Sequence, residues 1–259
     1  INWQKSWDSK EGGPNRAPKF PIPNNYEFLM QYAYLSKDNA SKEHLKLTLD
    51  KMAMGGIYDQ IGGGFARYST DALWKVPHFE KMLYDNAQLV SLYSQAYALT
   101  KKEDYKRIVE QTLAFVDREL TDKSGAFYSA LDADTEGEEG KYYVWKKEEL
   151  QKVLEDDYDW VKDYYNINPN GFWEHNNYIL LRRESDEEFA KRKNWTLNEL
   201  YEKVSKVNFS LLKERERRTT PGLDDKTLTS WNALMLKGYA EAYQYLGNTT
   251  YLQSAIKNA

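Results

Sequence analysis

The feature of this sequence that most constrains its fold is a succession of apolar stripes at helical spacing, separated by short polar turns. Apolar side chains that recur every three or four positions indicate amphipathic helices, and short turns fold consecutive helices back on each other as antiparallel hairpins. We therefore expect a mainly α protein built from helical hairpins. The expected helices cover residues 24–34, 41–53, 77–96, 105–120, 147–154, 157–165, 196–217 and 228–246.

Strand signals are confined to short segments between these helices. β-prone stretches flank an acidic, glycine-containing loop, at residues 126–131 and 141–145, and another lies near Tyr178. Residues 1–25 are punctuated by proline and glycine, which predicts an extended lead-in.

Charge and composition exclude several classes of protein. The chain has 36 basic and 40 acidic residues, and its formal net charge of −4 argues against nucleic acid as a partner. No apolar run approaches the roughly 20 residues of a membrane-spanning helix, so no membrane is expected as a partner either. The absence of cysteine removes disulfides, zinc–cysteine sites and thiol catalysis. With only separated histidines left, we expect no metal and no cofactor, and a cytoplasmic protein.

Aromatic residues make up 15% of the chain, including 21 tyrosines and 8 tryptophans. Rings beside carboxylates are typical of sugar-binding clefts, because the C–H faces of sugars stack on rings. The alternative is that the tyrosines pack helices together and keep their hydroxyls wet. Composition leaves both interpretations open.

Residues 55–89 read GGIYDQIGGGFARYSTDALWKVPHFEKMLYDNAQL and resemble one family, the spermatogenesis-associated protein 20-like proteins. Three later or earlier segments resemble the same family: GGPNRAPKFP at 12–21, SALDADTEGEEGKYYVW at 129–145 and DDKTLTSWNALM at 224–235. The family joins a thioredoxin-like domain to a six-hairpin glycosidase-like α/α toroid. The resemblance implies that residues 26–259 form an incomplete toroid, with the thioredoxin-like domain before them and the last hairpins after them.

The chain departs from the family pattern in places. Ala66 stands where the family usually has a histidine, Pro14 and Asn15 replace a Phe-Gly pair, and His175 interrupts a usual glycine. The lost histidine puts any role carried by position 66 in doubt.

The richest candidate site lies in the first of these segments. Arg67, Tyr68 and Trp74 are predicted to bind substrate, and His78 and Glu80 to be catalytic. We expect His78 in the first turn of the helix that starts one residue earlier, where the helix dipole favours the neutral imidazole of a general base. Glu80 would be the paired acid. The alternative is that both side chains only satisfy loop amides.

Acidic and aromatic groups elsewhere extend this site. Asp132 and Asp134 are predicted to bind substrate, although an acidic turn can equally be a solvated loop, and the later ligand spacing of an EF-hand is missing. Asp225 is predicted either to be catalytic or to cap the following helix. The substrate-binding set is completed by Glu174, Trp231 and Asn232.

We expect residues 61–80, 132–139 and 224–232 to converge on one cavity. One function is then a carbohydrate-processing enzyme, similar to sugar epimerases and isomerases or to glycoside hydrolases, that acts on a small carbohydrate-like ligand by acid–base chemistry. The other is a non-catalytic module that binds a glycan or a protein beside the thioredoxin-like domain. An incomplete toroid would also expose apolar faces, which predicts self-association.

Overall fold

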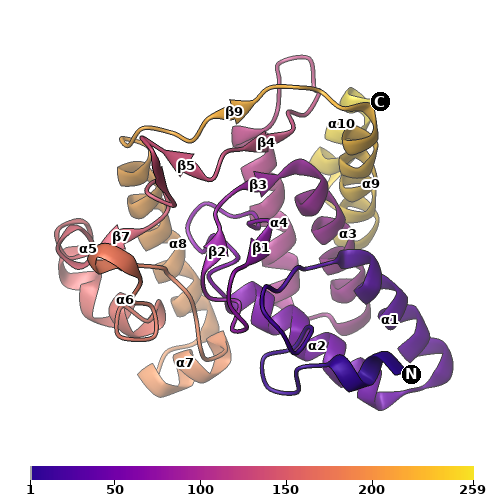
Figure 1. Ribbon diagram of the computed structural model, residues 1–259, viewed down its shortest axis with the longest axis horizontal. Helices are drawn as coiled ribbons and strands as arrows, with labels where there is room; N and C mark the ends of the chain where they lie inside the picture. Colours follow the sequence, from indigo (N-terminus) through magenta and orange to yellow (C-terminus); the bar gives the residue numbers. More distant parts are fainter. Residues whose placement is uncertain (1) are drawn as a thin grey trace.

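The computed structural model describes residues 2–259. Three helical hairpins in this range share one turn geometry. In each, the residue after the first helix is left-handed, with φ of 54° at Lys37, 56° at Lys101 and 77° at Gly247. An extended residue follows and starts the next helix, so two residues reverse the chain (Figure 1). The hairpins are α1–α2 (Pro23–Ser36, Asn39–Met54), α3–α4 (Leu83–Thr100, Glu103–Glu119) and α9–α10 (Thr229–Leu246, Thr249–Asn258).

Helix α3 packs against α1, α4 and α9. Leu83, Leu89, Leu92 and Tyr93 are all fully buried, although they lie on different sides of the helix. A helix that is apolar all round needs neighbours on all sides, which explains its central place. The mainly α class and the antiparallel hairpins are thus confirmed. No helix in the described range is long and apolar enough to cross a membrane.

A second group of helices packs around its own core, on the left of Figure 1. Its centre is formed by the fully buried side chains of Trp145, Leu150, Val161, Phe189 and Leu200. The group comprises α5 (Lys147–Leu154), α6 (Tyr158–Tyr164), α7 (Asp186–Lys193) and α8 (Leu197–Arg215), with short 3-10 helices η2 (Glu155–Asp157) and η3 (Glu174–Asn176).

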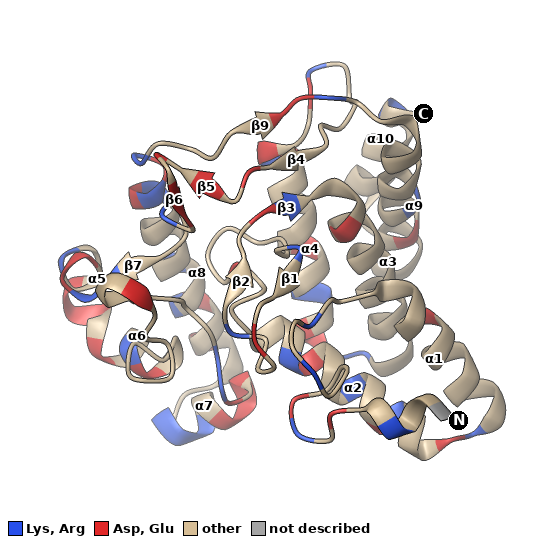
Figure 2. Cartoon of the chain, in the orientation of Figure 1, with Lys and Arg blue, Asp and Glu red and all other residues tan. Residues whose placement is uncertain are grey.

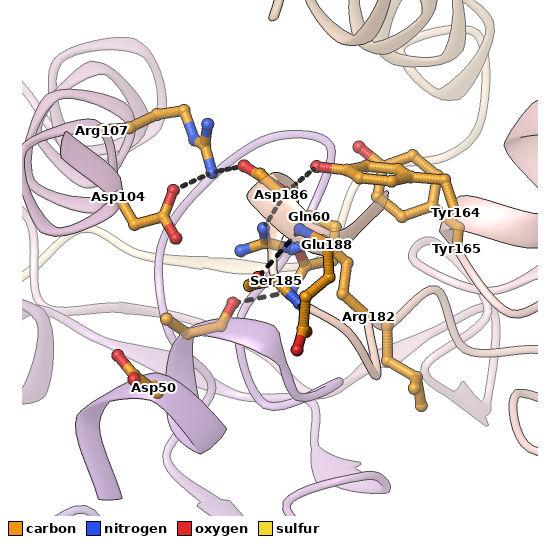
Figure 3. A network of polar contacts seen from close by, with 12 residues as sticks. Asp50, Gln60, Asp104, Arg107, Tyr164, Tyr165, Arg182, Ser185, Asp186 and Glu188 are labelled. Carbon is orange, nitrogen blue, oxygen red and sulfur yellow. Dashed lines mark hydrogen bonds and ion pairs between the residues drawn. The ribbon is translucent and has the colours of Figure 1, made fainter. Parts of the chain in front are cut away.

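A buried ionic network joins the two groups of helices (Figure 3). The carboxylate of Asp186 accepts hydrogen bonds from Arg182 at 2.6 Å, from the Tyr164 hydroxyl at 2.8 Å and from Arg107 at 2.5 Å. Arg107 belongs to α4 and also donates to Asp104 at 2.8 Å. Asp186 is completely buried, so these donors replace its water, and the two arginines hold its pKa below the usual range against the effect of burial.

The described strands are all two residues long and antiparallel, as the short β-prone stretches predict. The pairs are β1–β2 (Tyr68–Ser69, Pro77–His78), β5–β6 (Asp134–Thr135, Glu138–Glu139) and β7–β8 (Trp145–Lys146, Asn177–Tyr178), and β4 (Ala130–Leu131) lies between β3 (Lys81–Met82) and β9 (Leu223–Asp224). The β3–β4–β9 sheet brings together the ends of the three expected site segments, 61–80, 132–139 and 224–232. The lead-in contains one short 3-10 helix, η1 (Asn2–Ser6), and Ile1 lies outside the described residues.

The helix expected to begin at Pro77 begins instead at Leu83. Residues 77–82 are extended because β2 pairs with β1 and β3 pairs with β4. His78 is therefore a strand residue, and the argument from the helix dipole does not apply to it.

The glycine-rich loop before β1 packs on α4. Gly63 has φ +77°, and a Cβ there would come within 2.3 Å of the Gln111 carbonyl oxygen. The buried Lys81 fixes the loop, since its ammonium donates to the Gly63 carbonyl and to Asp59, both at 2.8 Å. The close approach that glycine allows is thus used for packing.

Candidate functional site

His78 faces Tyr68 across the β1–β2 hairpin, and the two rings stack with their centroids 5.0 Å apart. Phe20 also stacks on Tyr68, at 4.6 Å. The Nδ1 atom of His78 lies 2.8 Å from Glu139 Oε1, and Nε2 lies 3.6 Å from Glu80 Oε2. Two carboxylates from different segments therefore hold this imidazole from its two sides.

Glu80 and Arg67 form an ion pair beside the imidazole, with 3.4 Å between Nη1 and Oε2. Their backbones are also joined, because the Arg67 amide donates to the Glu80 carbonyl at 2.9 Å. A hydrogen bond to the Tyr84 hydroxyl, helped by the charges of Glu80 and Asp85, raises the pKa of Arg67. Arg67 thus connects Glu80 to the first turn of α3.

Asp85, in that first turn, is the residue that the sequence interpretation missed. It is 8% exposed, and its Oδ2 atom makes no hydrogen bond to any residue of the described chain. Burial raises the pKa of Asp85 to about 7; the charge of Arg67 and the Tyr84 hydroxyl oppose this rise, and the charge of Glu80 adds to it. Near neutral pH this carboxyl exchanges between its acid and its ionised form.

We call Arg67, His78, Glu80, Tyr84 and Asp85 the acid–base cluster. Trp231 of α9 reaches it, since its half-buried ring lies edge-on to Tyr84 with centroids 4.8 Å apart. The cluster therefore contains the predicted Arg67, His78 and Glu80, and the predicted Tyr68 and Trp231 contact it through His78 and Tyr84.

Two predicted substrate-binding residues belong to the core instead. Trp74 is fully buried, and its indole donates to the Glu11 carbonyl at 2.9 Å. Asn232 is buried too: its Oδ1 accepts from the Phe127 amide at 2.8 Å and its Nδ2 donates to the Phe127 carbonyl at 2.9 Å. In this structure both side chains are engaged in packing and in hydrogen bonds to the backbone.

Asp225 does not cap α9. That helix begins at Thr229, its N-cap is Leu228, and no side chain supplies a capping hydrogen bond there. Asp225 lies too early in the chain for that role. It is exposed and forms no hydrogen bond or ion pair with any residue from 2 to 259.

In the acidic loop, Glu139 contacts His78 of the cluster, whereas Asp132 and Asp134 are exposed and lie apart from it. Asp132 is tied to Gly222 through its backbone amide at 2.8 Å, and Asp134 faces Glu139 across the β5–β6 hairpin. Neither makes a hydrogen bond to the acid–base cluster in the described structure. In Figure 2, acidic residues colour β5 and β6.

Next to Glu139 the surface is hollowed into an open groove of about 1060 Å³. The groove is lined by Glu139 and by the predicted Glu174, but not by His78, Glu80 or Trp231. The three segments thus meet around a cluster and an adjoining groove, where one shared cavity was expected. No three His, Asp or Glu side chains within residues 2–259 are placed to hold a metal ion.

Comparison with known proteins identifies relatives that extend along the whole chain. No family model matches. An uncharacterized protein of Caenorhabditis elegans is 35% identical over 286 residues, which cover 99% of this chain and 39% of the worm protein. Human spermatogenesis-associated protein 20 is 36% identical over 285 residues, which cover 98% of this chain and 36% of the human protein. The chain is a relative of spermatogenesis-associated protein 20.

The resemblance read from the sequence is thereby confirmed, and the chain spans less than two fifths of the length of these curated relatives. Among solved structures, a sugar epimerase from a ruminal bacterium matches with a TM-score of 0.45 and 13% identity, over 99% of this chain and 81% of the epimerase. The acid–base cluster lies in residues 67–85, inside the segment whose motif carries the resemblance to spermatogenesis-associated protein 20.

Proposed function

We propose that the acid–base cluster is a catalytic site for a small carbohydrate, acting as a sugar epimerase or isomerase, or as a glycoside hydrolase. The observation that carries the proposal is Asp85, a buried carboxyl with a pKa of about 7 and an oxygen that no described residue satisfies. Catalytic acids need a pKa near the working pH, and burial next to charged groups is how proteins reach it.

Two carboxyl groups in different surroundings can share acid and base roles. Asp85 is shielded from water and holds its proton up to about pH 7, so it can donate that proton. Glu80 is ion-paired with Arg67 at 3.4 Å, so it can accept a proton or stabilise positive charge. His78 lies 3.6 Å from Glu80 and orients it.

Epimerisation and hydrolysis differ in the atom of the sugar that loses or receives a proton. In an epimerisation, one group removes the proton beside a sugar carbonyl and another returns it to the opposite face. In a hydrolysis, the acid protonates the oxygen of the leaving sugar while a carboxylate faces the developing cation. The half-buried ring of Trp231, which meets Tyr84 edge-on beside the cluster, offers a face for the C–H side of a sugar.

In one assay, the whole chain is incubated in D₂O with glucose, mannose or cellobiose, and the sugar is followed by proton NMR. In a second assay, the whole chain is incubated with p-nitrophenyl glycosides. Deuterium at the carbon beside the carbonyl would show epimerisation, and release of nitrophenol would show hydrolysis. We expect Asp85→Asn and Glu80→Gln each to lower turnover by about 10²–10⁴-fold. The exposed Asp156→Asn is the matched control.

Sugar binding without deuterium exchange or cleavage would contradict catalysis and support the non-catalytic module. Turnover that survives Asp85→Asn unchanged would place the chemistry elsewhere.

A further inference from the structure

The groove beside Glu139 lies outside the acid–base cluster. It lies between the acidic loop, the segment around η3 and the chain that leaves α8, which come from distant parts of the sequence. Its volume of about 1060 Å³ lies slightly above the roughly 300–1,000 Å³ typical of ligand pockets, and so exceeds what a single sugar ring would fill.

The groove adjoins the acid–base cluster at Glu139. One oxygen of this carboxylate lies 2.8 Å from His78 Nδ1, and the same residue lines the groove together with Pro77, the neighbour of His78. A ligand with one end at the cluster can therefore extend along the groove.

The charges of the lining side chains are largely paired with each other. Lys141 contacts Glu138 at 3.1 Å and Glu136 at 3.4 Å, and Arg218 contacts Glu149 at 2.6 Å. Such a surface offers many donors and acceptors but little net charge. It fits a neutral, hydroxyl-rich ligand better than a polyanion or a basic peptide.

Further lining groups remain unused by the protein. The hydroxyl of Thr135 is buried and has no hydrogen-bond partner among the described residues, which is ordinarily unfavourable. Lys146 and Glu174 are exposed and form no hydrogen bond or ion pair through their side chains within residues 2–259. Trp173 lines the groove with its half-buried ring, which Phe79 steadies at a centroid distance of 5.3 Å.

We infer that the substrate is an oligosaccharide, whose end unit enters the acid–base cluster while its further units occupy the groove over Trp173. This inference rests on the proposed function and adds the substrate class to it. Trp173 supplies the stacking face, and Thr135, Lys146 and Glu174 supply hydrogen bonds to sugar hydroxyls.

The test measures binding by calorimetry and turnover for glucose, maltohexaose, cellohexaose and mannohexaose with the whole chain. We expect a hexasaccharide to bind more tightly than glucose and to have the higher kcat/KM. Trp173→Ala should raise the Kd of that hexasaccharide about tenfold, equivalent to about 1.4 kcal/mol. Phe172→Ala is the matched control, because this neighbouring ring is exposed and does not line the groove.

Trp173→Ala removes a partly packed ring, so Lys146→Ala and Glu174→Gln repeat the test at exposed positions, with the exposed Lys152→Ala as their control. Both should reduce the advantage of the hexasaccharide over glucose. The oligosaccharide inference is overturned if hexasaccharides bind no more tightly than glucose, or if the groove variants still prefer the hexasaccharide as strongly as the parent does. In either case, turnover of glucose that depends on Asp85 would still support the proposed function. If no sugar is bound or converted, both fail.

Discussion

Asn86 and Asn232 occupy the same place in two helical hairpins and bind the backbone in the same way. Asn86 accepts from the Phe65 amide at 2.7 Å and donates to the Phe65 carbonyl at 3.0 Å. Asn232 makes the equivalent pair with Phe127, at 2.8 Å and 2.9 Å. Each amide also donates to the carbonyl four residues earlier, at the start of its own helix. The two asparagines therefore fix equivalent loops to equivalent helix starts.

The equivalence continues into the helices. Tyr93 stacks on Phe65 with centroids 5.6 Å apart, and Tyr239 stacks on Phe127 at 5.5 Å, each tyrosine lying two turns after its asparagine. The α3–α4 and α9–α10 hairpins are thus a structural repeat, as an α/α array requires. Asp85 and Trp231 directly precede the two asparagines, so the repeat delivers an acid and a ring to the same cluster.

Removing either asparagine side chain should destabilise the protein. Asn86→Ala or Asn232→Ala leaves a buried backbone amide and carbonyl without partners, which costs about 2–3 kcal/mol of unfolding free energy. Urea unfolding followed by circular dichroism measures the loss. Asn198→Ala, at an exposed position of α8, is the control and should change little. A loss below that of the control in both variants would contradict the shared role.

Asp85 should make stability depend on pH. Its pKa is about 7 in the folded protein and 3.8 is the ordinary value, so the folded state binds the proton more tightly and becomes less stable as pH rises from about 4 to about 7. Asp85→Asn removes this dependence. The variant should match the parent near pH 4 and exceed its unfolding free energy by up to roughly 4 kcal/mol near pH 8.

Urea unfolding of both proteins across this pH range provides the measurement, because all other titrating groups cancel in the difference. A difference that stays constant with pH would show that Asp85 is not buried in its acid form.

The helices could be predicted from the sequence because their apolar stripes are local signals. The start of α3 could not: residues 77–82 have helix-compatible side chains, but pairing with β1 and β4 makes them extended. That pairing depends on residues far away in the chain, which periodicity does not report.

The site was predictable only in part for the same reason. His78 and Glu80 stand out as chemical residue types, and the structure brings them together. Asp85 looks like an ordinary first-turn aspartate, and only its burial beneath other segments distinguishes it. A polar amide next to a tryptophan can bind either a ligand or a loop, and the sequence does not show that Asn232 donates to the Phe127 carbonyl.

The ionic network around Asp186 should be a strong link between the two helix groups. Asp186→Asn leaves the buried Arg182 and the half-buried Arg107 with less counter-charge, and breaking a buried ion pair in this way typically costs about 3–5 kcal/mol. The double variant Arg182→Met/Asp186→Leu should cost less than Asp186→Asn, because it removes opposite charges together. Thermal unfolding of both variants measures this, and a double variant that is the less stable one would contradict the assignment.

His78 should matter for activity more than for folding. The residue is part-exposed and contributes no backbone contact through its ring, so His78→Ala should cost under about 1 kcal/mol of stability. His78→Ala should lower kcat, because Glu80 and Glu139 lose the imidazole between them. His78→Gln can still donate to a carboxylate, so it should recover part of the lost kcat. A variant that unfolds would support the interpretation that the histidine only braces the loops.

Asp225 provides the sharpest test of how the start of α9 is held. A capping carboxylate would be worth about 1 kcal/mol, but the structure gives α9 no side-chain cap and leaves Asp225 exposed. We therefore expect Asp225→Asn to change the unfolding free energy by less than about 0.5 kcal/mol. Thr196→Ala is the matched comparison, because Thr196 caps α8 by accepting from the Glu199 amide at 3.2 Å, and its loss should cost about 1 kcal/mol. Equal losses in the two variants, measured by urea unfolding at one pH, would show that Asp225 caps a helix after all.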